Sequence, residues 1–266
     1  MSSEPIYIVT MKVVPKPEEI VFDPVTKTID RSKATNEINP ADKNALEEAL
    51  KLKDRYGGKV IILSMGPPFF EPFLKIGVSM GADDAILVSD KALAGSDAYV
   101  TSKVLARAIE KIGSPTLILC GEESSDGSTG QVPPGVASWL NIHQATYVSK
   151  VIELDLSKRI VVVRRTIKGG YEDLEIPIPA VLAIELGANT PRLPDFRRKR
   201  WVEKEFKVKI WSLNDLNLKP EEVGLVGSPS RVRELREIKP PERLRKIIEN
   251  LDEAANEILK LIKNKK

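Results

Sequence analysis

The sequence predicts an α/β fold in which a parallel sheet is covered by helices on both faces. Short apolar runs alternate with amphipathic segments at the spacing of βαβ units from Ile6 to Leu140. The runs carry few polar residues, which is typical of strands that are buried on both faces. With 266 residues the chain can bury one large core or two modest ones.

The elements of this α/β part follow from apolar patterns and helix-end signals. A first strand is expected over 6–14 and a small hairpin over 22–30. The first helix begins at Asn39, a plausible N-cap, because Pro40 fits the first helical position and Asp42 suits the positive end of the helix dipole. Further strands are expected over 59–65, 85–88 and 117–120, and further helices over 70–76, 97–111 and 131–140.

The pattern becomes rich in β-forming residues after Gln144. We interpret three strands there as an antiparallel meander added to the parallel sheet, and 179–184 as a possible return to that sheet. The segment 202–213 is either helix or strand. The three strands of the meander are expected over 144–154, 159–167 and 171–178. Proline and glycine are scattered over 220–241, which predicts an extended arm, and 243–263 is an amphipathic helix.

Composition excludes several classes of protein. No stretch approaches the roughly 20 apolar residues that span a bilayer. Residues 1–5 lack a basic segment followed by an apolar one, so we expect a cytoplasmic protein with no membrane insertion. Cys120 is the only cysteine and His143 the only histidine, which excludes an intrachain disulfide and a Cys/His metal cluster. The net charge of +3 does not suggest a nucleic-acid binder.

A loop rich in Gly, Ser and Thr runs from Gly121 to Gln131 and leads into a helix. Such a loop can offer unpaired backbone N–H groups and hydroxyls to phosphate. An ordinary connection uses the same residue types for turns and caps, so the loop alone does not separate the two readings. Ligands of parallel sheets lie outside the carboxyl ends of the strands. Three more polar elements are expected at that edge, at 10–12, 39–42 and 64–66, and their convergence favours a phosphate site.

The chain lacks the motifs of nucleotide-using enzymes. No Gly-x-Gly-x-x-Gly follows the first strand, and no Gly-x-x-x-x-Gly-Lys-Ser/Thr is present. The Ser-Gly-Gly-x-Asp-Ser loop of ATP-splitting members of related α/β folds is also missing. His143 is expected at the surface and Cys120 in the core, so neither is expected to act as base or nucleophile. We therefore predict a nucleotide holder with no catalytic residue and no metal site.

Five motifs occur in a characteristic order. They are Met11-Lys12, residues 39–42 (Asn-Pro-Ala-Asp), residues 64–67 (Ser-Met-Gly-Pro), residues 126–131 (Asp-Gly-Ser-Thr-Gly-Gln), and a region from Val163 to Ala183 that contains Gly169-Gly170. In this order they resemble the β subunit of electron transfer flavoprotein, over the chain from Ile6 to about Val208. One departure is Lys168, which stands where an acidic residue usually precedes the glycine pair.

The resemblance implies an adenine-nucleotide α-hydrolase-like sandwich and a heterodimer with the α subunit of electron transfer flavoprotein. The C-terminal domain of that partner would carry most of the FAD site. The β subunit would hold AMP, or a second FAD in electron-bifurcating members. The residues that would line its pocket are Thr10, Asn39, Pro40, Ala41, Asp42, Met65, Gly121, Asp126, Gly127, Ser128, Thr129, Gly130 and Gln131.

The segment 187–200 resembles the loop that docks on partner enzymes, which would be acyl-CoA or other flavin dehydrogenases. Leu193 falls at the position of the anchoring leucine, and its basic continuation comprises Arg197, Arg198, Lys199 and Arg200. Basic residues beside Trp201 could also indicate nucleic acid, but the overall charge balance favours a protein contact. Residues 1–213 would form the nucleotide-binding domain, and 214–266 an arm and helix that dock on the partner subunit.

The implied function is electron transfer between dehydrogenases and a downstream quinone reductase or other acceptor. The chain would be a carrier subunit rather than a self-contained enzyme, or a part of an electron-bifurcating complex. The alternative is a stand-alone adenine-nucleotide sensor of the stress-protein type without flavin. That alternative gives no role to the meander, the docking loop or the C-terminal arm.

Overall fold

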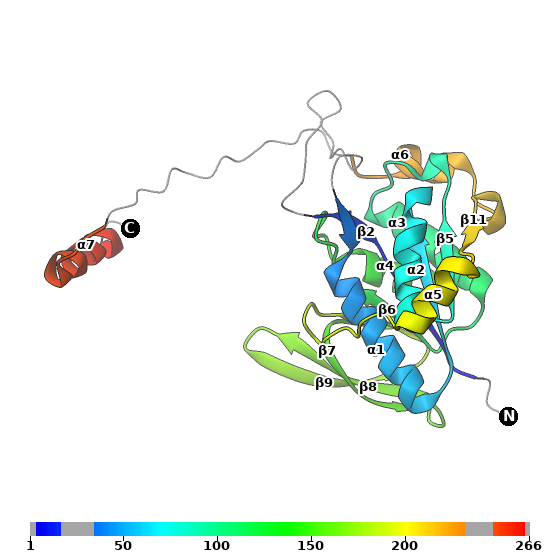
Figure 1. Ribbon diagram of the computed structural model, residues 1–266, viewed down its shortest axis with the longest axis horizontal. Helices are drawn as coiled ribbons and strands as arrows, with labels where there is room; N and C mark the ends of the chain where they lie inside the picture. The colour runs from blue at the N-terminus through cyan, green and yellow to red at the C-terminus, as the bar shows by residue number, and fades with distance from the viewer. Residues whose placement is uncertain (1–3, 17–34, 232–246, 264–266) are drawn as a thin grey trace. The chain divides into compact units, whose positions relative to one another are not determined.

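A computed structural model describes residues 4–16, 35–231 and 247–263 (Figure 1). The chain divides into two compact units, Met1–Arg233 and Glu234–Lys266, and each is described by itself. The hairpin expected over 22–30 lies outside the described residues.

The first unit is built on a nine-stranded sheet. Every neighbouring pair from β11 to β7 is parallel, and β8 and β9 extend the sheet as antiparallel strands. The predicted α/β fold, with a mostly parallel sheet and an antiparallel addition, is confirmed. In sheet order the strands are β11 (Lys209–Trp211), β5 (Asp84–Val88), β4 (Lys59–Met65), β1 (Ile6–Thr10), β6 (Leu117–Gly121), β10 (Ala180–Ile184), β7 (His143–Asp155), β8 (Ile160–Ile167) and β9 (Gly170–Pro177).

Helices cover both faces of this sheet (Figure 1). Successive side chains of a strand point to opposite faces, so Tyr7 and Val9 of β1 join one core and Ile8 joins the other. The first core is closed by α1 (Pro40–Tyr56), α2 (Glu71–Met80) and α5 (Phe196–Lys204), and the second by α3 (Ala98–Ile112) and α4 (Val132–Leu140).

The strand β7 joins the parallel sheet to the meander. Its first residues pair in parallel with β10, from His143 to Val148, and the rest pairs antiparallel with β8. The predicted return of 179–184 to the main sheet is confirmed, because β10 lies between β6 and β7.

The prediction of one continuous strand over 6–14 is wrong. β1 ends at Thr10, and β2 (Val13–Pro15) pairs with β3 (Asn36–Ile38) in a separate two-stranded sheet. The chain turns out of the main sheet at Lys12, whose N–H donates to the carboxylate of Asp42. The apolar pattern continues across this turn and therefore gives no sign of it.

The segment after residue 187 contains more helix than expected. Residues 197–200 lie on α5, whose N-cap Asp195 accepts a hydrogen bond from the N–H of Arg198 at 2.7 Å. The segment predicted as helix or strand holds both, since β11 follows α5.

The residues after β11 pack on the first unit. Leu216, Leu218 and Val223 are buried in the second core. The arm expected from residue 214 therefore begins within a compact unit that reaches Arg233. The short helices of this unit are η2 (Pro68–Phe70), η3 (Lys91–Leu93), η4 (Asn214–Leu216), η5 (Pro220–Glu222) and α6 (Gly224–Gly227).

The second unit contains α7 (Leu251–Lys263), which begins later than the helix predicted from residue 243. Residues 243–246 lie outside the described part. The apolar stripe of α7 is exposed within its own unit, and it comprises Leu251, Ile258, Leu259, Leu261 and Ile262.

Candidate functional site

The strand order reverses between β1 and β6. From β1 the chain continues to β4 and β5 on one side of the sheet, and then crosses to β6 on the other side. A crevice outside the carboxyl ends of the strands is expected at such a point. Thr10 ends β1 and Gly121 ends β6, so two of the predicted site elements flank the reversal.

Asp42 ties the two strand ends together. Its Oδ2 accepts the N–H of Lys12 at 2.7 Å, and its Oδ1 accepts the N–H of Gly121 at 3.0 Å. Burial raises the pKa of Asp42 to about 6, while hydrogen bonds from Lys12, Asn39 and Gly121 act in the opposite direction. Both carboxylate oxygens are thus engaged by the chain itself, and Asp42 fixes the edge at which a ligand would bind.

Gly121 allows the close approach of α1 to this edge. A Cβ at Gly121 would collide with Oδ1 of Asp42 and would lie 2.8 Å from the Cβ of Ala41. Ala41 is in the first turn of α1, so the helix would have to move to make room. The glycine is required by packing, since its backbone conformation is not in the left-handed region.

Asn39 tethers the loop that follows β6. Its Nδ2 donates to the carbonyl of Glu123 at 2.9 Å, and its Oδ1 accepts the N–H of Ser125 at 3.1 Å. Asn39 occupies the N-cap position of α1, but its side chain makes no capping hydrogen bond. The prediction that Asn39 caps α1 with its side chain is therefore wrong, because the amide is used by the loop.

Lys12 lies at this edge of the sheet with its charged side chain. From the sequence it is assigned to a motif but is not predicted to be a pocket residue. Its Nζ donates to Oδ1 of Asp126 at 2.6 Å and to Oγ of Ser124 at 3.2 Å. The side chain of Asp126 is only 2% exposed, whereas that of Lys12 is 39% exposed. Lys12 could have been predicted as a site residue, because a lysine directly after the first strand lies at the edge of the sheet where ligands bind.

The tip of the loop carries the free backbone donors. The N–H groups of Gly127 and Ser128 both donate to the carbonyl of Ser124, at 3.3 and 2.8 Å. The N–H groups of Thr129 and Gly130 donate to no atom in the described part of the chain. Gly127, Ser128 and Thr129 are exposed, so small side chains surround these donors.

The first turn of α4 provides fewer donors than an ordinary helix N-terminus. Pro133 and Pro134 lie in this turn and have no N–H. The N–H of Gly135 already donates to the carbonyl of Gln131 at 3.0 Å. An anion at this edge would therefore be held mainly by the loop that precedes α4.

The other predicted pocket residues lie at the ends of neighbouring strands. Met65 ends β4 and is half-buried, and Oγ of Ser64 before it is buried without a partner among the described residues. Burial raises the pKa of the Cys120 thiol to about 12, and a hydrogen bond with the Thr10 side chain opposes this rise. His143 is exposed at the start of β7, at the opposite edge of the sheet.

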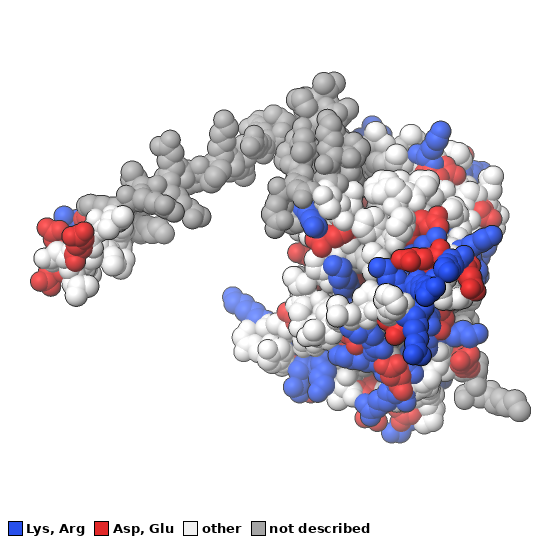
Figure 2. Space-filling view, viewed as in Figure 1, with Lys and Arg blue, Asp and Glu red and all other residues white. Residues whose placement is uncertain are grey.

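The predicted docking residues do not share one environment. Leu193 is 87% exposed, and Arg197, Lys199 and Arg200 are exposed on α5. Arg198 instead donates to the carbonyls of Val78 and Ala82 and so fastens α5 to the end of α2. Figure 2 shows basic side chains over the region of α5, with acidic side chains among them.

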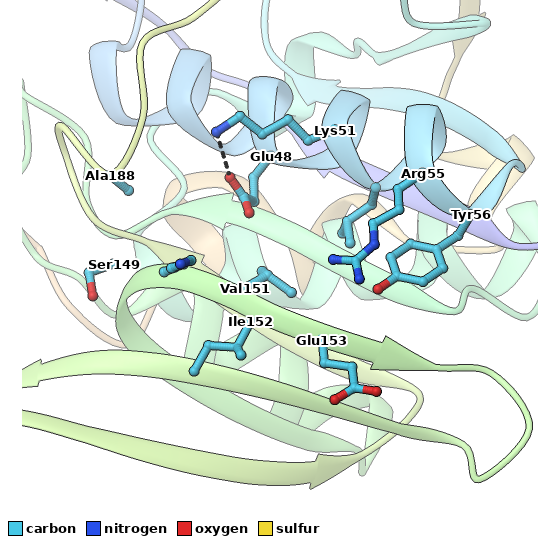
Figure 3. A pocket seen from close by; sticks show the side chains of 11 residues that line it. Glu48, Lys51, Arg55, Tyr56, Ser149, Val151, Ile152, Glu153 and Ala188 are labelled. Carbon is cyan, nitrogen blue, oxygen red and sulfur yellow. Dashed lines mark hydrogen bonds and ion pairs between the residues drawn. The ribbon is translucent and has the colours of Figure 1, made fainter.

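The described residues form two grooves that are not lined by the strand ends at the reversal point. One, of about 310 Å³, lies between α1 and β7, and Figure 3 shows Glu48, Arg55 and Tyr56 directed from α1 towards β7. Acidic and basic side chains both line it, and it contains no predicted pocket residue. The other, of about 460 Å³, lies between α3 and α4 and includes Gln131.

Among the described residues no helix is both long enough and apolar enough to span a membrane.

Comparisons with known proteins give a consistent result. A family model described as "Electron transfer flavoprotein domain" matches residues 26–209. The chain is 43% identical over 225 residues to the electron transfer flavoprotein subunit beta of Thermoanaerobacterium thermosaccharolyticum, with 85% of each chain covered. It is 40% identical over 253 residues to protein FixA of Azotobacter vinelandii, with 92% of this chain and 88% of FixA covered. It is 36% identical over 235 residues to the caffeyl-CoA reductase-Etf complex subunit CarD of Acetobacterium woodii, with 88% and 87% covered.

Proposed function

The chain belongs to the β-subunit family of electron transfer flavoproteins, and we propose that it holds an adenine nucleotide in a heterodimer with an electron transfer flavoprotein α subunit. The observation that carries this proposal is the loop after β6. It offers the N–H groups of Thr129 and Gly130, which have no acceptor among the described residues, after the strand that flanks the reversal of strand order. The heterodimer would pass electrons from flavin dehydrogenases to a downstream acceptor.

The residues at this edge fit a phosphate group. The two N–H groups belong to a loop of small residues. The half-buried side chain of Lys12 holds this loop through its ion pair with Asp126. Asn39 and Asp42 hold the loop and both strand ends in place. A bound flavin would supply the redox chemistry, and the residues of this chain would bind and orient the nucleotide.

We propose one of two nucleotides for this site. AMP would make the heterodimer a simple carrier, whereas a second FAD would fit an electron-bifurcating complex. The relatives include a subunit named for a caffeyl-CoA reductase-Etf complex as well as proteins named only as beta subunits. A count of flavin and AMP in the purified heterodimer decides between the two, since two flavins exclude the AMP form.

The proposal also includes docking on partner dehydrogenases through the segment 187–200. Leu193 is almost fully exposed, and exposed basic residues follow on α5. A single apolar anchor beside charges makes a small, transient contact whose charges accelerate encounter. The exposed apolar stripe of α7 would bind the α subunit.

Co-expression with an α subunit tests the proposal directly. The expected product is a yellow complex that contains both chains and bound adenine nucleotide. A colourless mixture in which the two chains do not associate would exclude the proposed function.

A further inference from the structure

The docking leucine lies in a loop that is tied to α1 by polar contacts. We propose that Arg192 is the positioning residue of this loop and that Asn189 assists it, so that together they fix the place from which Leu193 reaches a partner. This inference rests on the proposed docking function of Leu193. The proposed role of Arg192 and Asn189 is to hold the loop in place, whereas Leu193 is the residue that would contact the partner.

Arg192 engages one buried carboxylate with both its backbone and its side chain. The backbone N–H and Nε of Arg192 both donate to Oε2 of Glu47 at 2.9 Å, and Nη2 donates to Oε1 at 3.1 Å. The side chain of Glu47 is 6% exposed. Nη2 also donates to Asp54, about two turns further along α1 than Glu47, at 2.8 Å. Hydrogen bonding to Glu47 raises the pKa of Arg192 further, so the guanidinium is charged at any working pH.

Asn189 makes a second attachment three residues earlier in the chain. Its Nδ2 donates to the carbonyl of Asn44 at 3.0 Å and to Oε2 of Glu48 at 3.1 Å. Nδ2 of Asn44 donates back to the carbonyl of Asn189 at 2.6 Å, and Oδ1 of Asn44 accepts the N–H of Gly187 at 3.1 Å. The loop is therefore held on α1 at Gly187, Asn189 and Arg192.

These contacts determine the geometry at Leu193. The backbone at Arg192 is fixed in both position and direction, because its N–H and its side chain bind the same carboxylate. Leu193 follows at once and points to solvent, where it is 87% exposed. An exposed side chain on a loose loop would be competent for docking for only part of the time. The apparent affinity for a partner would fall by that fraction.

A planar guanidinium is needed for this arrangement. Nε and Nη2 bind the two oxygens of Glu47 side by side, and Nη2 reaches Asp54 as well. A lysine ammonium is a point charge and cannot reproduce this fork. Arg192→Lys should therefore retain the side-chain attachment in part, and Arg192→Met should abolish it, leaving the backbone N–H of Arg192 and the contacts of Asn189.

Hydrogen–deuterium exchange of the intact heterodimer measures the attachment without any partner. In Arg192→Met we expect the amides of 186–193 to exchange about tenfold faster or more, with Arg192→Lys in between. Exchange in the loop 121–131 and the bound nucleotide content should not change. Arg197→Met is the matched control, since Arg197 is an exposed arginine of α5 with no partner in the described residues. Equal exchange at 186–193 in the wild type and in Arg192→Met would overturn the proposal.

Electron transfer then tests the consequence for docking. With a flavin dehydrogenase that reduces the wild-type complex, Arg192→Met should raise KM for the heterodimer about tenfold and leave kcat largely intact. Leu193→Ala should raise KM as well. If Leu193→Ala raises KM and Arg192→Met does not, Arg192 has no positioning role. If the loop is released in Arg192→Met but neither variant changes KM, the docking function of Leu193 fails instead.

Discussion

Gly121→Ala should damage the ligand edge through packing alone. The added Cβ would meet Oδ1 of Asp42 and would lie 2.8 Å from the Cβ of Ala41, at the start of α1. Overpacking of this kind costs about 1–3 kcal/mol. Distortion of the buried N–H to carboxylate hydrogen bond adds roughly 1.5–3 kcal/mol. Together we expect a loss of about 2.5–6 kcal/mol in the free energy of unfolding.

The assay is thermal unfolding of the purified heterodimer, together with its nucleotide content. At about 2–4 °C per kcal/mol for a domain of this size, Gly121→Ala should lower Tm by roughly 5–24 °C. Gly127→Ala is the control in the same loop, because its Cβ would meet only Oγ of Ser124 at 3.4 Å, an ordinary contact. The reasoning is refuted if both variants melt within about 1 °C of the wild type.

Three further predictions concern the edge and the docking loop. Lys12→Met removes the ion pair that ties the first strand's end to Asp126 of the loop, so nucleotide retention after gel filtration should fall about tenfold, with unchanged retention counting against a role for Lys12. The pKa of Asp42 is raised to about 6 in the fold from 3.8, so its stabilising contribution is present below pH 4 and is lost as pH rises to 6. The wild type should therefore lose roughly 3 kcal/mol relative to Asp42→Asn between pH 4 and 7 in denaturant titrations, and parallel pH profiles would contradict this. Leu193→Ala should impair electron delivery from partner dehydrogenases with cofactor content intact, and a loss of flavin would show that the loop is structural.

Much of the fold could be predicted because local patterns and burial agree. The strand 117–120 is an apolar run because β6 is buried on both faces. Pro40 predicts the start of α1, because proline fits the first position of a helix. The convergence of polar elements also follows from strand direction. Lys12, Asp42 and Gly121 do meet at one edge through hydrogen bonds.

The errors come from contacts between residues that are far apart in the chain. Nothing local ends the first strand at Thr10, since the turn at Lys12 depends on the carboxylate of Asp42. Asn39 has the residue type of an N-cap, but its amide is taken by a loop more than 80 positions later. Arg198 belongs to a basic run, yet its guanidinium caps carbonyls at the end of α2. Sequence patterns show which residue types are present. Contacts between residues far apart in the chain decide which polar groups stay available to a ligand.

The continuity of β7 has a mechanical consequence. One strand of 13 residues runs from the parallel sheet into the meander without an intervening loop, and it is irregular near Tyr147, whose φ is +54°, where its pairing passes from β10 to β8. Force applied to β8 or β9 is therefore transmitted through the hydrogen-bond ladder between β7 and β10 to the strand beside β6. The meander and the strand that leads into the loop at Gly121 are therefore parts of one hydrogen-bonded sheet.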